Sequence, residues 1–155
     1  MLKRNLLSLP PATLFACLAL PAFASWSYSP GGGPAGSASV RGSDGSVLTV
    51  DCGNSGEVGV VVKPDIRPTS MRRGAEGYLG FVIDGRENQR INVLVRCEAN
   101  QCSSGGRPGV LPLVQALRAG SSVQIWWEDW DLATYSLAGS SRAIGRIQAA
   151  GCPGF

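Results

Sequence analysis

The residue types best suited to chemistry gather in one short segment, residues 126–131, which reads WWEDWD. Carboxylates beside indoles are typical of sites that cleave glycans, because sugar rings stack on aromatic faces and hydrolysis needs a pair of acids. Glu128 and Asp131 would be these acids, but no second carboxylate can be placed opposite them across a cleft. The alternative is a hairpin turn whose acids face solvent. We therefore take Trp126, Glu128 and Trp130 as candidate binding residues and assign no catalytic residue.

The alternation before this turn predicts which tryptophan is buried. Apolar residues recur at every second position from Val123 to Trp127, which is the period of a half-buried strand. Successive side chains of a strand point to opposite faces. We therefore expect Trp127 in the core and Trp126 on the outer face, where it is the candidate contact for a partner protein.

The absence of histidine argues against several classes of enzyme. The chain contains no histidine, which removes the commonest general base and every nucleophile pair that depends on it. We also find no G-x-S-x-G elbow, P-loop or dinucleotide fingerprint. The sequence therefore favours a non-enzymatic protein without a cofactor or a metal site.

A second candidate binding feature is an arginine-rich loop. Residues 64–77 contain prolines, glycines and three arginines, Arg67, Arg72 and Arg73. Long loops of this kind are either mobile or functional. Guanidinium groups can hold a carboxylate or phosphate through paired hydrogen bonds, so these arginines are candidate binding residues. The alternative is a solvated charged loop.

The cysteines indicate an oxidising compartment. Of the five, Cys17 lies in the predicted leader, and the others are Cys52, Cys97, Cys102 and Cys152. An even number in an exported protein implies disulfides. Zinc is the alternative, but the chain has no C-x-x-C pair and no histidine. Three pairings are possible, and we favour Cys97–Cys102 across a short loop with Cys52–Cys152 joining an early strand to the chain end.

Residues 1–24 have the three parts of a secretory signal peptide. Lys3 and Arg4 form a basic start, an apolar centre follows, and Ala22-Phe23-Ala24 ends the segment. We predict cleavage after Ala24 and a periplasmic or secreted protein without a stable membrane span, with lipidation of Cys17 as the alternative. Removing the leader lowers the formal charge of +3 by two, which leaves no basic excess for binding nucleic acid.

Hairpin patterns dominate the rest of the chain. Residues 25–37 are rich in glycine and proline and predict an N-terminal linker, so the single disulfide-bonded domain would span 38–155. In the first hairpin, a loop with a left-handed Gly45 would pair Val40 with Leu48 and keep apolar residues on one face.

The later segments complete a mainly β fold. Strands are predicted at 57–63, 78–84 and 89–97, and helical patterns at 111–119 and before Gly151, the second capped by Ser140 or Ser141. This predicts an antiparallel sandwich or partly open barrel with one short inserted helix and a C-terminal helix.

The ending LRAGSSVQIWW…TYSLAGSSRAIGRIQAAGC, within residues 117–152, resembles the C-terminal strand and helix of small exported proteobacterial proteins of the invasion-associated locus B type. The resemblance implies a periplasmic or surface β-rich domain without known catalytic residues. We therefore expect an exported, non-enzymatic protein that binds a protein partner at the envelope. The alternative is a small glycan-binding or glycan-cleaving enzyme that uses the WWEDW turn.

Overall fold

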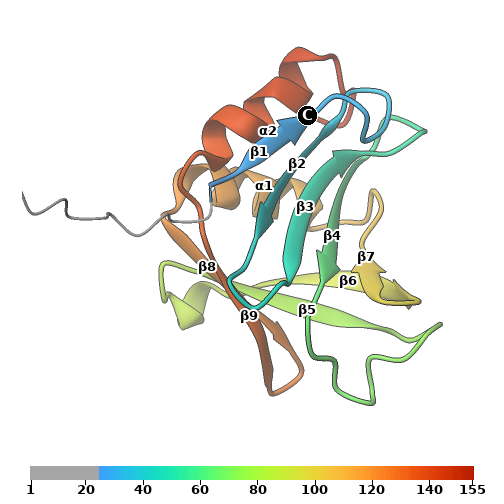
Figure 1. Ribbon diagram of the computed structural model, residues 1–155, viewed down its shortest axis with the longest axis vertical. Coiled ribbons are helices and arrows are strands. Elements are labelled where there is room, and N and C mark those ends of the chain that lie inside the picture. The colour runs from blue at the N-terminus through green and yellow to red at the C-terminus, as the bar shows by residue number, and fades with distance from the viewer. Residues whose placement is uncertain (1–24) are drawn as a thin grey trace, which may run out of the picture.

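The computed structural model describes residues 25–155, and the predicted signal peptide with Cys17 lies outside the described residues. Within residues 25–155, nine strands form one antiparallel sheet in the order β1-β2-β3-β4-β7-β6-β5-β8-β9 (Figure 1). The strands are β1 (Ser27–Ser29), β2 (Ser37–Arg41), β3 (Val47–Cys52), β4 (Val58–Lys63), β5 (Glu76–Ile83), β6 (Ile91–Glu98), β7 (Gln101–Ser103), β8 (Ser122–Trp127) and β9 (Trp130–Ser136). The helices are the short 3-10 helix η1 (Glu87–Gln89), α1 (Val110–Ala119) and α2 (Ser140–Ala149). The fold is mainly β with one inserted helix and one C-terminal helix, as predicted.

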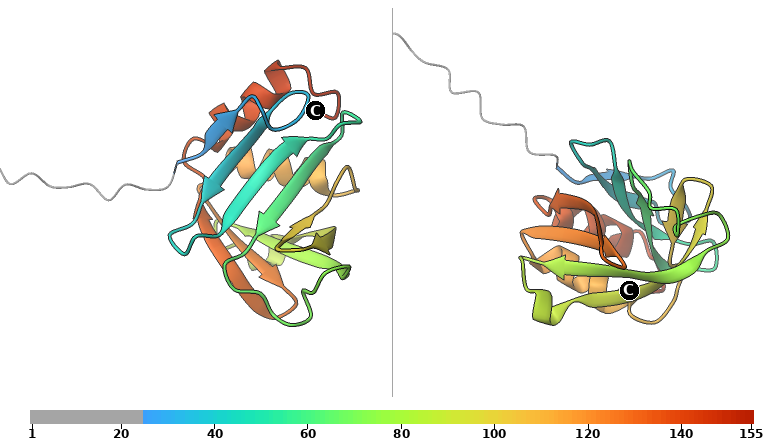
Figure 2. Two further views of the ribbon diagram at one scale, coloured as in Figure 1. Left: turned by 45° about the vertical axis from the view of Figure 1, so that its right-hand side comes forward. Right: turned by 90° about the horizontal axis from the view of Figure 1, so that it is seen from below.

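The sheet curls until its two edges meet at Trp26, just before β1. The Trp26 amide donates a hydrogen bond to the Ala138 carbonyl at 3.3 Å, and its indole Nε1 donates to the Ser136 carbonyl at 3.2 Å. Trp26 thereby links the first strand of the sheet to the end of the last. In Figure 1, β5 and β6 run at a steep angle to β2, β3 and β4, and Figure 2 shows this curvature from two other directions. Of the two predicted architectures, a partly open barrel describes this sheet.

Residues 25–37, predicted as a linker, belong to the folded domain. β1 pairs with β2, and Trp26 is buried in the core with only 7% of its surface exposed. Gly33 and Gly36 have positive φ angles of 112° and 80°, which glycine adopts readily because it has no Cβ atom. The glycines that suggested a linker instead let the chain reverse between β1 and β2.

The hairpin between β2 and β3 has the predicted register. Gly45 has a φ angle of 89° in the loop, and Val40 pairs with Leu48. Both of these side chains are buried. In the next predicted hairpin, formed by β5 and β6, Phe81 pairs with Ile91. The alternating faces produce one apolar inner surface, which the two helices cover.

Both helices bury one apolar stripe against the sheet. α1 packs on β4, β5 and β6, and α2 packs on β1, β2 and β3. The buried apolar residues are Val110, Leu113, Val114 and Leu117 in α1 and Ala143, Ile144 and Ile147 in α2. The prediction that a serine caps α2 is wrong, because Gly139 occupies the N-cap and no side chain bonds to the free amides. Ser140 is instead buried, and its hydroxyl donates to the Leu117 carbonyl at 2.7 Å, which joins the two helices.

Both predicted disulfides are confirmed. Cys52 at the end of β3 is bonded to Cys152 after α2, and Cys97 of β6 is bonded to Cys102 of β7. The first bond spans 100 residues of sequence and ties the C-terminal helix to the sheet. No helix in residues 25–155 combines the length and the apolar character that crossing a membrane requires.

Candidate binding site at the tip of the β8–β9 hairpin

The acidic aromatic segment forms a tight turn at the tip of the β8–β9 hairpin. Trp127 pairs with Trp130, so only Glu128 and Asp129 lie between the strands. Glu128 has a φ angle of 53°, which a residue other than glycine seldom adopts. The burial pattern follows the predicted alternation: Trp127 is 3% exposed, whereas Trp126 is half-buried on the outer face.

The loop between β4 and β5 is fixed to this tip through Ser70. The Trp127 Nε1 donates to the Ser70 hydroxyl at 3.0 Å, and that hydroxyl donates to Glu128 Oε2 at 3.3 Å. The neighbouring Met71 is completely buried and anchors the loop in the core. The Glu128 carboxylate is therefore bonded to the β4–β5 loop.

A pocket of about 320 Å³ lies on the outer face beside Trp126. Its lining residues are Val82, Glu87, Arg90, Trp126, Glu128 and Asp129. The Arg90 guanidinium lies over Gly80, where a Cβ atom would overlap it, and its Nη2 donates to the Glu128 carbonyl at 3.5 Å. Gly80 is also the strand partner of Trp126. We refer to this site as the Trp126 pocket.

Sequence reasoning missed Arg90 and Glu87 as members of this site. Both lie in the turn between β5 and β6, far from the WWEDW segment along the chain. A signal did exist, because an isolated glycine inside a strand pattern, here Gly80, often marks the close approach of another group. It does not reveal which side chain approaches.

A second recess, of about 210 Å³, lies at the same tip around Trp130. Its lining residues are Asp44, Asp65, Ile66, Trp130, Asp131 and Leu132, and we call this surface the tip patch. Trp130 is 56% exposed and Ile66 is 74% exposed. Asp44 comes from the β2–β3 turn, and Asp65 and Ile66 come from the loop after β4. Two segments distant in the sequence therefore join β9 of the hairpin to build the patch.

The two acids of the catalytic alternative have different hydrogen-bond partners. The Glu128 carboxylate is directed to Ser70, whereas Asp131 Oδ2 accepts a hydrogen bond from Gln124 Nε2 at 2.7 Å. Gln124 shares the outer face with Trp126, so Asp131 is bonded on that face, whereas Glu128 is bonded to the β4–β5 loop. Glycoside hydrolysis uses two acids that face each other across the substrate, and here each acid accepts a hydrogen bond from a different side chain.

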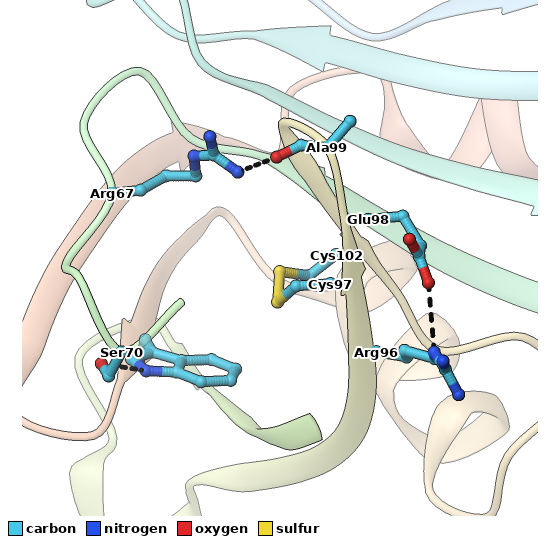
Figure 3. The surroundings of a disulfide bond; sticks show 8 residues. Arg67, Ser70, Arg96, Cys97, Glu98, Ala99 and Cys102 are labelled. Carbon is cyan, nitrogen blue, oxygen red and sulfur yellow. Dashed lines mark hydrogen bonds and ion pairs between the residues drawn. A yellow bond between two sulfur atoms is a disulfide. The ribbon is translucent and has the colours of Figure 1, made fainter. Parts of the chain in front are cut away.

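The three arginines of the candidate loop lie away from both recesses. Arg67 donates to the carbonyl of Ala99 at the turn between β6 and β7, and Arg73 forms an ion pair with Glu98 at 3.5 Å. Figure 3 shows Arg67 reaching this turn beside the Cys97–Cys102 disulfide. Arg72 is exposed and has no ion pair among residues 25–155. Two of the three arginines therefore attach their loop to the β6–β7 hairpin.

The base of the hairpin is held by a carboxylate. Asp84 Oδ1 accepts hydrogen bonds from the amides of Ser121 and Ser122 at 2.8 and 2.9 Å, where α1 passes into β8. These two bonds lower the pKa of Asp84 below its usual value. In β9, burial raises the pKa of Tyr135 to about 12, so its hydroxyl stays neutral.

The described residues offer no obvious metal centre. In residues 25–155, no three acidic or cysteine side chains come together in an arrangement that could hold a metal ion. The chemistry available at the tip is instead aromatic and aliphatic contact, hydrogen bonding to carboxylates and, in the Trp126 pocket, the guanidinium of Arg90.

Comparison with known proteins gives one family assignment. Curated proteins and solved structures yielded no significant match. The family model described as YfjT matches residues 24–144, a span that includes all nine described strands and ends inside α2. The chain therefore belongs to the YfjT family.

Proposed function

We propose that this protein is exported and acts without catalysis, by binding a protein partner through the tip patch. The observation that carries this proposal is the exposure of Trp130 and Ile66 side by side on a supported tip. Aromatic side chains dominate the energy of protein interfaces, and contiguous exposed apolar surface is typical of interaction sites. The Ser70 hydrogen bonds and the buried Met71 hold the loop before binding, which reduces the entropy that a partner must overcome.

Several observations support the proposed location outside the cytoplasm. The two disulfides fit an oxidising compartment. The signal-peptide pattern before Ser25 and the resemblance of residues 117–152 to exported proteins point the same way. Together these features support the proposal of a periplasmic or secreted location.

The experiment is affinity capture with matched variants. Mature protein beginning at Ser25 is immobilised, exposed to an envelope extract, and the captured proteins are identified by mass spectrometry. Trp130→Ala and Ile66→Ala should each lose the specific partner. Leu111→Ala removes another exposed apolar side chain, on α1, and should keep it. Retention of the same partner by both tip variants would show that the tip patch is not the contact.

Glycan binding at the Trp126 pocket is the second candidate function. The observation in its favour is a half-buried indole beside Arg90, Glu87 and Asp129, a combination of a stacking face and hydrogen-bonding groups in a pocket large enough for a small ligand. A glycan array probed with the wild type and with Trp126→Ala tests it. Signals that disappear in Trp126→Ala but survive in Trp130→Ala would support glycan binding, and identical arrays for all three proteins would contradict it.

A further inference from the structure

The tip patch is lined by acidic side chains and by no basic side chain. Three of its lining residues are aspartates, Asp44, Asp65 and Asp131, and none is a lysine or arginine. Four ion pairs occur in residues 25–155, and none includes any of these aspartates. The recess that holds the exposed side chains of Trp130 and Ile66 is therefore lined by three carboxylates, and none of them is in an ion pair within residues 25–155.

Two of the carboxylates are already held in position. Asp44 Oδ1 accepts hydrogen bonds from the Ser46 amide and hydroxyl at 2.9 and 2.5 Å. Asp131 Oδ2 accepts from Gln124 Nε2 at 2.7 Å. Since a carboxylate has two acceptor oxygens, each of these groups has a second oxygen for a ligand. Asp65 lies against the β2–β3 turn, because its Oδ1 is 3.8 Å from the position of a Cβ atom on Gly45.

The basic residues nearest along the chain, Arg41 and Lys63, do not line the tip patch. Arg41 and Lys63 both pair with Val47, so all three share one face. The buried side chains of these strands, such as Val40 and Leu48, occupy the opposite face. Arg41 is directed to the carbonyl of Gly45 and does not line the tip patch. Neither basic residue forms an ion pair with an aspartate of the patch in residues 25–155.

We propose that the partner presents a basic segment to the tip patch. This inference rests on the proposed function and names the chemistry of the partner. An arginine of the partner would stack on the exposed Trp130 indole and bond to the free oxygens of the aspartates, while an adjacent apolar side chain covers Ile66 and Leu132. Guanidinium groups suit this site because they combine stacking on aromatic rings with paired bonds to carboxylates. An acidic partner would meet like charges at every edge of the patch.

Defined peptides test the chemistry directly. Three fluorescein-labelled peptides of equal length are titrated with the disulfide-bonded mature protein and followed by fluorescence anisotropy. Arginine, citrulline or glutamate alternates with leucine in the three peptides. The arginine peptide should bind at least about tenfold more tightly than the citrulline peptide, which keeps the shape but lacks the charge. Its affinity should fall as salt is raised from low ionic strength, because exposed charges are screened.

Matched variants locate the binding on the protein. Asp65→Asn and Asp131→Asn together should weaken the arginine peptide about tenfold or more. Asparagine at residue 131 can still accept the Gln124 hydrogen bond, and a denaturation midpoint close to wild type verifies the fold. Asp129→Asn makes the same charge change at the same tip but in the Trp126 pocket, and it should leave the affinity unchanged.

The outcomes separate this inference from the proposed function. Equal binding of the arginine and citrulline peptides, tighter binding of the glutamate peptide, or unchanged affinity in the double variant would overturn the basic-partner inference. If Trp130→Ala still abolishes capture of the envelope partner in that case, the tip patch remains the contact and only its charge preference is wrong. If Trp130→Ala affects neither the peptide nor the capture, the proposed function fails.

Discussion

Apolar side chains are buried at the base of the β8–β9 hairpin and exposed at its tip. At the base, β9 runs into α2, whose Ile144 and Ile147 are completely buried, and the helix end is tied to β3 by the Cys52–Cys152 disulfide. At the tip, Trp130 and Ile66 remain largely exposed. One end is thus covered and cross-linked, and the other is left open on a supported loop.

This difference shows that the exposed tip is not simply a loosely built end of the molecule. Trp127, the strand partner of Trp130, is almost completely buried and hydrogen-bonded to Ser70. Trp127 and Trp130 are therefore paired across the hairpin but have opposite environments. Trp127 is buried and supports the tip from the core, whereas Trp130 is exposed and available to a ligand. The comparison predicts that the buried set controls stability and the exposed set controls binding.

Removing the cross-link at the covered end should have the largest effect. In the chain-entropy account, a closed loop of about 100 residues stabilises the fold by about 4–5 kcal/mol and the short Cys97–Cys102 loop by roughly 2 kcal/mol. Replacing Cys52 and Cys152 by serine should therefore lower the free energy of unfolding more than replacing Cys97 and Cys102. Urea denaturation of the two double variants measures this. The reverse order would mean that the covered end does not depend on its disulfide.

Truncating the buried tryptophan of the tip should come next. Trp127→Ala removes a large core side chain and the partner of Ser70, and a loss of about 3–5 kcal/mol is expected in the free energy of unfolding. Denaturant midpoints measure it, with Trp126→Ala as the comparison. Because Trp126 is only half-buried, its truncation should cost less. A greater loss for Trp126→Ala would reverse the assignment of faces.

The helix at the covered end should show a similar contrast between faces. Ile147→Ala empties a completely buried site and should cost about 2–5 kcal/mol. Gln148→Ala loses only an exposed hydrogen bond from Arg118 at 3.1 Å and should change stability little. Equal small losses from chemical denaturation of both variants would mean that α2 does not seal the core.

Acid should weaken the base of the hairpin through Asp84. The Ser121 and Ser122 amides lower the pKa of Asp84 from its ordinary 3.8, so the folded state favours the ionised form. This contribution is complete above pH 3.8 and is lost as the pH falls through the lowered folded-state pKa. The stability difference between wild type and Asp84→Asn should therefore shrink in that acid range, as followed by urea denaturation at several pH values.

Asp51 supplies a control of opposite sign. Burial raises the pKa of Asp51, with the charge of Glu57 adding to the shift. The contribution of its titration favours folding below pH 3.8 and is lost as the pH rises through the raised folded-state pKa. Asp51→Asn should therefore gain stability relative to wild type as the pH rises. A change in the same direction for both variants would contradict these assignments.

The smallest effect on stability is expected for Trp130→Ala. Surface substitutions away from special features usually change the free energy of unfolding by no more than about 0.5 kcal/mol. Because Trp130 is mostly exposed, the denaturation midpoint of the Trp130→Ala variant should match that of the wild type. Partner capture by this variant should be lost. A loss of stability comparable to that of Trp127→Ala would remove the distinction between a supporting and a contacting tryptophan.

Local patterns predicted most of the fold. Alternation placed Val40 opposite Leu48 and Trp127 inside, since a register shift of one residue would turn apolar side chains to solvent. The linker prediction failed because glycine composition does not distinguish a flexible segment from a turn between two paired strands. The candidate site was predicted only in part: Trp126 and Glu128 line one pocket, Trp130 lines another recess, and the three arginines line neither.

By itself, then, the sequence determined the mainly β class, the register of the first hairpin, the terminal helix and the number of disulfides, and it favoured the disulfide pairing that the structure has. These depend on side-chain periods and on cysteine count and spacing. The tertiary structure alone decided that Ile66 meets Trp130, that Arg90 crosses Gly80, and that Trp26 joins the sheet edges. Such contacts link segments far apart in the chain and depend on strand order and on how far the sheet curls. A periodic pattern indicates which face of a strand is buried. It does not indicate which side chain from a distant segment lies beside that face.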